Sequence, residues 1–304
     1  MSATKWTTAN IPDQTGRIAD ITGANSGLGL ETARELAIKG ASVTLAVRSL
    51  DRGQEAIDDI KSDAPEANLS LQELDLASLE SIGQAATDLG EKLPRIDLLI
   101  NNAGVMYTPK QQTADGFEMQ FGTNHLGHFA WTGQLIDRLT SVEGSRVVTV
   151  SSIGHRLRSE IDFDDLNAAG GYNRVSAYGR SKLANLLFTY ELQRRLVAAG
   201  AEAVALAAHP GGSDTELGRH IPGANFLRPV LKYMTQSAAM GALPTLRAAT
   251  DPSATGGQYY GPDGFAETQG HPVLVKSSGR SHEIETQQRL WAASEELTGV
   301  TFPI

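Results

Sequence analysis

The sequence predicts an α/β fold with a mostly parallel, doubly wound sheet and helices on both faces. Short apolar runs recur along the chain, and helical patterns separate most of them, which is the alternation that right-handed βαβ crossovers produce. A glycine-rich turn follows the first run directly, as it does in sheets that bind dinucleotides. No linker or repeat interrupts the pattern, so we expect one domain over residues 1–304. The expected strands lie near residues 18–22, 43–47, 69–74, 97–101, 146–151, 203–208 and 258–260, seven in all.

Composition excludes several classes of protein. The chain has a formal net charge of −9 and no basic block, which argues against nucleic acid as the main partner. It has no cysteine, which excludes disulfides, thiol catalysis and zinc–thiolate sites. No apolar run approaches the ~20 residues that a membrane-spanning helix needs, and the polar N-terminus is not a signal peptide. We therefore expect no membrane span and a cytoplasmic location.

The first expected strand leads into a turn with the glycine spacing G-x-x-x-G-x-G and then into the helical stretch 30–37. Such a turn lets the backbone approach a pyrophosphate closely, and the helix N-terminus supplies NH groups and a favourable dipole. Glycines can also serve only to make a tight turn, so the spacing is informative because of the strand and helix around it. The residues expected to bind the phosphates are Gly23, Asn25, Ser26, Gly27, Leu28 and Gly29.

Asp20 is an anomaly in the same strand. The first strand of a doubly wound sheet is covered on both faces and is normally apolar. An ionised carboxylate in that place is costly unless it is paired or hydrogen-bonded. We expect Asp20 to be bonded to neighbouring backbone or protonated, and Asp20→Val to stabilise the fold.

The end of the second strand bears on the choice of cofactor. An acidic residue there would bind the ribose hydroxyls of NAD and repel the 2′-phosphate of NADP. Here the strand ends in Val47-Arg48, and a guanidinium pairs with phosphate through a fixed fork of donors. We therefore expect Arg48 to favour NADP(H), with NAD(H) possible. The alternative is that Arg48 only covers the sheet edge and pairs with Asp51.

Small polar residues follow two later strands. The run 96–100 ends in Asn101-Asn102-Ala103-Gly104, and the run 147–150 ends in Ser151-Ser152. Small residues at the carboxyl ends of strands leave room for a ligand in an open α/β sheet. Asn102, Ala103 and Gly104 are therefore candidates for cofactor binding, although an ordinary turn, or capping by the serines, would explain the same residues.

Tyr178 and Lys182 stand four residues apart in a stretch that reads as one continuous helix. At that spacing the two side chains lie on the same face, one turn apart. The ammonium group of Lys182 should lower the pKa of Tyr178 from its usual value of about 10. A phenol tuned in this way can exchange a proton with an alcohol or carbonyl oxygen. Taken alone, the pair could also be an ordinary amphipathic helix face.

Taken together, these motifs resemble those of the short-chain dehydrogenase/reductase family, and the resemblance covers nearly the whole chain. The matching elements are Thr22 to Gly29, Asn101 to Gly104, Asn124, the serine pair, Tyr178 to Lys182, and Pro210-Gly211. Finer details resemble the branch of retinol dehydrogenases, protochlorophyllide reductases and WW-domain oxidoreductases. These details are the segments 123–129, 151–155 and 181–185.

The resemblance implies a single-domain, Rossmann-like oxidoreductase with four catalytic residues. Tyr178 would be the general acid or base, and Lys182 would tune it and bond the nicotinamide ribose. Ser152 would bind the substrate oxygen, with Ser151 as the alternative. Asn124 would anchor a water linked to Lys182, or would be a helix-interior amide bonded to backbone.

The family pattern also implies contacts farther from the reacting centre. Asp75 and Leu76 would hold the adenine, although Asp75 equally suits the N-cap of a helix over 77–86. Pro210, Gly211 and Thr215 would hold the carboxamide and phosphates. His155 would border the substrate or bridge backbone. The pair His125 and His128 is expected to be structural, with no metal site.

The segment 216–240 follows the cofactor loop and is expected to act as a substrate lid. The helix that carries Tyr178 could pair with its twin in a homodimer, although burial in the core would explain its leucines equally well. We expect an NADP-dependent enzyme that interconverts a carbonyl and an alcohol on a moderately large apolar small molecule. Two alternatives stay open: a cofactor-sensing regulatory protein on the same scaffold, and an NADPH-dependent carbon–carbon double-bond reductase.

Overall fold

The computed structural model describes residues 5–212 and 236–304. Eight strands in these residues form one sheet in the order β3-β2-β1-β4-β5-β6-β7-β8. The strands β1 to β7 pair in parallel, and β8 is antiparallel to β7. This confirms the doubly wound, mostly parallel α/β fold. The strands are β1 Ile18–Thr22, β2 Ser42–Val47, β3 Leu69–Glu73, β4 Leu98–Asn101, β5 Arg146–Val150, β6 Val204–Ala208, β7 Tyr259–Pro262 and β8 Pro272–Leu274.

The strand β8 was not predicted, so the expected count of seven was one too low. It has three residues and begins with proline. Proline lacks an NH for the sheet and is found in edge strands, and three residues are too few for a recognisable alternation. The short antiparallel strand therefore closes one edge of the sheet without a sequence signal.

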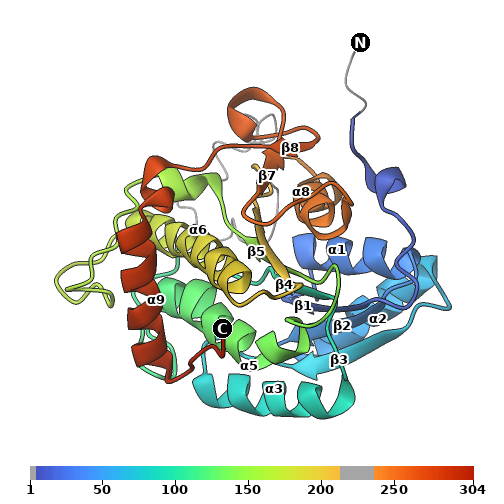
Figure 1. Ribbon diagram of the computed structural model, residues 1–304, viewed down its shortest axis with the longest axis horizontal. Coiled ribbons are helices and arrows are strands. Elements are labelled where there is room, and N and C mark those ends of the chain that lie inside the picture. The colour runs from blue at the N-terminus through green and yellow to red at the C-terminus, as the bar shows by residue number, and fades with distance from the viewer. Residues whose placement is uncertain (1–4, 213–235) are drawn as a thin grey trace.

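Helices cover both faces of the sheet (Figure 1). On one face α1 (Gly27–Ile38), α2 (Leu50–Asp63) and α8 (Ala238–Thr250) pack against the strands and bury a common apolar core. On the other face α3 (Leu79–Lys92), α5 (Gly127–Leu135) and α6 (Arg174–Ala198) bury a second core, with α9 (Ile284–Thr298) beside α6. Shorter helical segments are η1 Thr8–Asn10, α4 Met119–Phe121, η2 Gly122–Leu126, η3 Ile136–Arg138, η4 Ile153–Arg156, η6 Phe265–Glu267 and η7 Gly279–His282.

Local signals fix both ends of α6, the helix that carries Tyr178. The side chain of Asn173 accepts hydrogen bonds from the Val175 and Ser176 amides, which caps the N-terminus. At the other end Gly200 has a left-handed φ of +66°, and its amide donates to the Val197 carbonyl. The leucines of α6 are buried within the chain, so core packing accounts for them. A homodimer through this helix stays a prediction.

The aromatic residue of the C-terminal helix packs in the core. Trp291 in α9 is buried, and its ring stacks on that of Phe188 in α6 with centroids 5.8 Å apart. In the described residues, 5–212 and 236–304, no helix is both long and apolar enough to cross a bilayer. The cytoplasmic location stays a prediction.

Asp20 lies in β1 with no exposed surface, facing α5. One carboxylate oxygen accepts a hydrogen bond of 3.1 Å from the indole of Trp131, and the other has no partner. The expected bond to neighbouring backbone was therefore wrong, because a tryptophan from the covering helix takes that role. Burial raises the pKa of Asp20 to about 7, so a large share of the carboxyl groups are protonated at neutral pH.

We predict that Asp20→Val stabilises the fold at alkaline pH. An acid whose pKa is higher in the folded state weakens the fold as pH rises from its unfolded pKa of about 4 to its folded pKa of about 7. Above that range ionised Asp20 costs roughly 4 kcal/mol, against roughly 1–3 kcal/mol for leaving the Trp131 indole without an acceptor.

Chemical unfolding at about pH 4 and about pH 8 measures the difference. Between these two pH values, the unfolding free energy of Asp20→Val and of the isosteric Asp20→Asn should fall less than that of the unaltered protein. A lower unfolding midpoint for Asp20→Val than for the unaltered protein at the higher pH would contradict this account.

Candidate active site

The side chains of Ser152, Tyr178 and Lys182 meet beyond the carboxyl end of β5. Tyr178 and Lys182 come from consecutive turns of α6, and Ser152 caps the short helix η4 that follows the strand. Ser152 lies close enough to the Tyr178 hydroxyl to lower its pKa. Lys182 Nζ lies 5.9 Å from the centroid of the Tyr178 ring and donates to the Val150 carbonyl at 3.0 Å. Two hydroxyls and an ammonium group thus converge on one site.

Two glycines leave room for this arrangement. A methyl group placed on Gly154 would lie 3.0 Å from Tyr178 Cε1 and 3.3 Å from Ser152 Oγ. A methyl group on Gly104 would lie 3.1 Å from Asn124 Oδ1 and 3.4 Å from Lys182 Nζ. Side chains at these two positions would therefore push against the convergent polar groups.

The expected lowering of the Tyr178 pKa was wrong. Burial raises the pKa of Tyr178 to about 12, and the hydrogen bond with Ser152 offsets only part of that rise. Lys182 does not reverse the shift, because its ammonium group is directed to the Val150 carbonyl. Burial also lowers the pKa of Lys182 to about 8. The phenol of this site is therefore protonated at neutral pH.

The structure distinguishes the two serines. Ser151 is buried and its hydroxyl donates to the Lys182 carbonyl at 2.8 Å, which tethers β5 to α6. Ser152 is the serine beside the Tyr178 hydroxyl, and its Oγ also accepts from the Gly154 amide at 3.0 Å. Of the pair, only Ser152 is placed to contact a group that reacts at Tyr178.

His155 forms the backbone bridge that was one of its two expected roles, and a contact with substrate stays a prediction. The side chain has no exposed surface. Its Nδ1 donates to the Ser152 carbonyl at 2.6 Å, and its Nε2 accepts from the Ser278 amide at 3.0 Å. Both ring nitrogens are used, so His155 holds the serine loop in place.

Asn124 lies in the π-helical segment η2 and is completely buried. Its side-chain oxygen accepts from the Val105 amide at 2.8 Å, and its Nδ2 donates to the Val105 carbonyl and to Ser181 Oγ, both at 2.9 Å. Of the two readings of Asn124, the backbone-bonded amide describes its side chain. The residue clamps the loop after β4 to the catalytic helix.

The glycine-rich turn packs closely against the segment that follows β4. Gly23 and Gly27 have left-handed φ values of +67° and +56°. A methyl group on Gly29 would lie 2.4 Å from the Gly23 carbonyl oxygen and 2.5 Å from Asn102 Nδ2. The first turn of α1 is therefore held against the segment after β4, at the carboxyl end of β1, where NH groups of a helix N-terminus can bind a phosphate.

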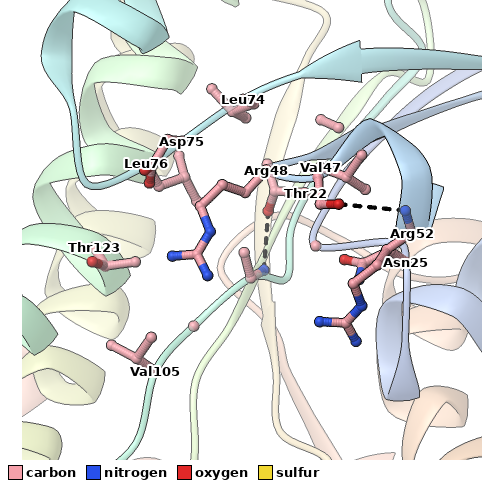
Figure 2. Close-up of a pocket in the computed structure, with 15 residues that line it drawn as sticks. Thr22, Asn25, Val47, Arg48, Arg52, Leu74, Asp75, Leu76, Val105 and Thr123 are labelled. Atoms are coloured by element: carbon pink, nitrogen blue, oxygen red, sulfur yellow. Dashed lines mark hydrogen bonds between the residues drawn. The ribbon is translucent and has the colours of Figure 1, made fainter. Parts of the chain in front are cut away.

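A pocket of about 210 Å³ opens next to this turn (Figure 2). It includes seven of the residues expected to bind the cofactor, namely Gly23, Asn25, Arg48, Asp75, Leu76, Ala103 and Gly104. It does not include Ser26, Gly27, Leu28, Gly29, Asn102, Tyr178, Lys182, Pro210 or Gly211. The other residues that line the pocket were not among the expected cofactor-binding residues: Thr22, Ala46, Val47, Ser49, Arg52, Leu74, Val105 and Thr123.

Arg52 is the most informative of the missed residues. Figure 2 shows the guanidinium groups of Arg48 and Arg52 extending in roughly the same direction from the segment after β2. Arg52 lies in α2, and the four-residue spacing from Arg48 was the available signal. Two arginines therefore face the pocket where the second strand ends.

Asp75 is not a helix N-cap, so that alternative was wrong. The helix α3 begins at Leu79 and is capped by Ser78. Asp75 Oδ1 instead accepts from the Ala77 amide at 2.9 Å, which shapes the turn beside the pocket. Pro210 and Gly211 follow β6, and Gly211 has a left-handed φ of +69°. Thr215 and the lid segment from 216 to 235 lie outside the described residues, while 238–240 begin α8.

Tyr107 is a further residue that the sequence reasoning missed. Its ring meets that of Tyr178 edge to face, with centroids 5.3 Å apart and planes at 74°. Its φ is +56°, a strained value for a bulky side chain, and the buried Gln120 holds its amide through a 2.8 Å hydrogen bond. No sequence pattern marks such a residue, because tertiary contacts impose its backbone conformation.

A family model described as short chain dehydrogenase matches residues 17–224. The chain belongs to the short-chain dehydrogenase family. This confirms the resemblance inferred from the motifs. Its fold and its chemistry are those of short-chain dehydrogenases, so the chain is an oxidoreductase that interconverts alcohols and carbonyls with a nicotinamide dinucleotide.

Relatives within the short-chain dehydrogenase family agree with this placement. Retinol dehydrogenase 13 of Homo sapiens is 41% identical over 304 aligned residues, which cover 97% of this chain and 87% of the relative. Retinol dehydrogenase 14 of Mus musculus is 40% identical over 301 aligned residues, which cover 94% of this chain and 86% of that relative. The chain is thus similar to the retinol dehydrogenase branch of the family.

Solved structures show the same fold. The crystal structure of an uncharacterized protein from Mycobacterium Paratuberculosis has a TM-score of 0.83 and 43% identity, and the match covers 99% of this chain and 100% of that one. RhlG of Pseudomonas aeruginosa, solved as an active-site complex with NADP, has a TM-score of 0.64 at 22% identity, covering 81% of this chain and 94% of that one. The second likeness concerns the fold alone.

Proposed function

We propose that this short-chain dehydrogenase reduces the carbonyl group of a moderately large apolar molecule with NADPH, and oxidises the corresponding alcohol. The observation that carries the proposal is the meeting of Ser152 and Tyr178 around Gly154, with Lys182 one helical turn away. When bound, the dinucleotide supplies or accepts the hydride. The protein groups bind and orient the substrate oxygen and donate a proton to it or accept one from it.

Each of the three residues has a separate role in the proposal. Ser152 donates a hydrogen bond to the substrate oxygen and stabilises the negative charge that develops on it. Tyr178 then gives its phenolic proton to that oxygen. Lys182 stands beside the phenolate that remains and stabilises it by its charge. Asn124 positions the loop of Gly104 and Val105 against this site without reacting.

The high pKa of Tyr178 bears on the direction of the reaction. A general acid must be protonated, and a phenol with a pKa of about 12 is protonated at neutral pH. Oxidation of an alcohol needs the phenolate as base, so its rate should rise with pH toward that value. At neutral pH the phenol is therefore in the protonation state that carbonyl reduction requires.

The residues present fit a dinucleotide with a 2′-phosphate. Gly23 lines the pocket at the carboxyl end of β1, where the pyrophosphate would bind. Asp75 and Leu76 line the far side of the pocket, where the adenine would lie. Arg48 and Arg52 both face that pocket, and no acidic residue follows β2 directly. These features support NADPH over NADH.

A cofactor and substrate panel tests the proposal. We expect NADPH oxidation with long-chain aldehydes, a retinoid aldehyde and apolar ketones, and a higher kcat/KM with NADPH than with NADH. The retinoid is included because of the names of the relatives. Matched enones test for reduction of a carbon–carbon double bond, and dinucleotide binding without turnover of any substrate would point to a regulatory protein. Either result would overturn the proposed carbonyl reduction.

A further inference from the structure

His128 lies in the first turn of α5 and is 1% exposed. Burial lowers its pKa to about 4, so the ring is neutral at neutral pH. Its Nδ1 is 2.9 Å from the Asn124 carbonyl oxygen, which can only accept, so Nδ1 carries the proton. The unprotonated Nε2 then accepts a hydrogen bond of 2.8 Å from the Thr22 hydroxyl. The environment thus fixes one tautomer of this histidine.

Thr22 ends β1 at the start of the glycine-rich turn. Because its proton goes to His128, its oxygen is left to accept, and the amides of Asn102 and Ala103 donate to it at 3.0 Å each. The backbone amide of Asn102 also donates to the Ile100 carbonyl, and its side-chain Nδ2 donates to the Thr22 carbonyl at 2.9 Å. The Thr22 side chain therefore joins the turn after β1 to the segment after β4.

We propose that His128 is a positioning residue for the cofactor: by fixing the direction of the Thr22 hydroxyl, it sets the two loops on which the dinucleotide lies. Thr22 and Ala103 both line the pocket, and Asn102 packs against Gly29. The same imidazole bonds the backbone of Asn124, whose side chain holds Val105 and Ser181. One ring thus connects the cofactor loops with the catalytic helix. The inference rests on the proposed dinucleotide function.

His125 provides a matched control three residues earlier. It is also 1% exposed and neutral, with its pKa lowered to about 3 by burial. Its Nε2 bonds to Ser294 Oγ in α9 at 2.9 Å, away from the cofactor loops. If His128 were purely structural, like His125, its replacement would lower stability and leave cofactor affinity unchanged.

The test compares His128→Gln, His128→Asn and His128→Leu with His125→Gln, measuring the Kd for NADPH by calorimetry and the melting temperature. The amide of glutamine reaches the position of Nε2 and can accept from Thr22, whereas that of asparagine reaches only the position of Nδ1. We expect Kd to rise about tenfold or more in His128→Asn and His128→Leu, and to stay within about threefold in His128→Gln. His125→Gln should lower the melting temperature with Kd unchanged.

A double-mutant cycle tests the connection to Thr22. Thr22→Val and His128→Leu should each raise the Kd for NADPH, and the double variant should raise it by less than the product of the two factors. If His128→Leu does not fold, His128→Asn takes its place in the cycle. Additive effects, or equal affinities in His128→Asn and His128→Gln, overturn the inference while the proposed function stands. If the unaltered protein binds no dinucleotide, both fail.

Discussion

Tyr178→Phe is expected to lower kcat for carbonyl reduction by roughly 10²–10⁴-fold, because the proton donor is lost. The Kd for NADPH should change little, since the phosphates are bound at the glycine-rich turn and not by the phenol. Lys182→Ala should lower kcat and raise the Kd for NADPH. The ammonium group stabilises the tyrosine's phenolate and also lies close to Gly104, which lines the cofactor pocket. Single-turnover kinetics with saturating NADPH, together with direct binding, separates the two effects.

Tyr190→Phe is the matched control for this experiment. Tyr190 lies on the same helix and its hydroxyl is hydrogen-bonded to Ser277 at 2.8 Å, away from Ser152. Its replacement should alter stability by about 1 kcal/mol and leave kcat unchanged. Near-normal turnover by Tyr178→Phe at saturating substrate and cofactor would refute the role of the phenol.

The paired change Val47→Asp with Arg48→Ile is expected to shift the preference from NADPH toward NADH by about a hundredfold in the ratio of kcat/KM values. The new carboxylate would bind ribose hydroxyls and repel a 2′-phosphate, and the loss of Arg48 would remove a fork of donors. Arg48→Lys should give an intermediate ratio, because it keeps the charge and loses the fork. An unaltered protein that already prefers NADH would show that Arg48 has been misassigned.

Patterns of neighbouring residues in the sequence predicted most of the fold. Seven strands and the glycine-rich turn follow from apolar runs and glycine spacing, which act over a few residues. The strand β8 has three residues and no such pattern. The extent of the single domain over 1–304 stays a prediction from the same patterns.

The chemical state of the site was harder to predict, because burial is a tertiary property. The i,i+4 spacing placed Tyr178 and Lys182 together, yet the direction of the Tyr178 pKa depends on how much protein covers the phenol. The role of His155 depends on Ser278, which is far away in the chain. Tyr107 became a candidate only when the loop that carries it was placed in space.

The bridge from Ser152 through His155 to Ser278 has a consequence for how the enzyme matures. During synthesis Ser152, Tyr178 and Lys182 leave the ribosome well before Ser278 does, so a nascent chain can hold every reacting group and still lack the bond that steadies the serine loop. Docking of the last segment, including α9 against α6, completes that loop. Catalytic competence should therefore arrive only after Ser278 has been translated, when residues 5–150 have already had the opportunity to fold.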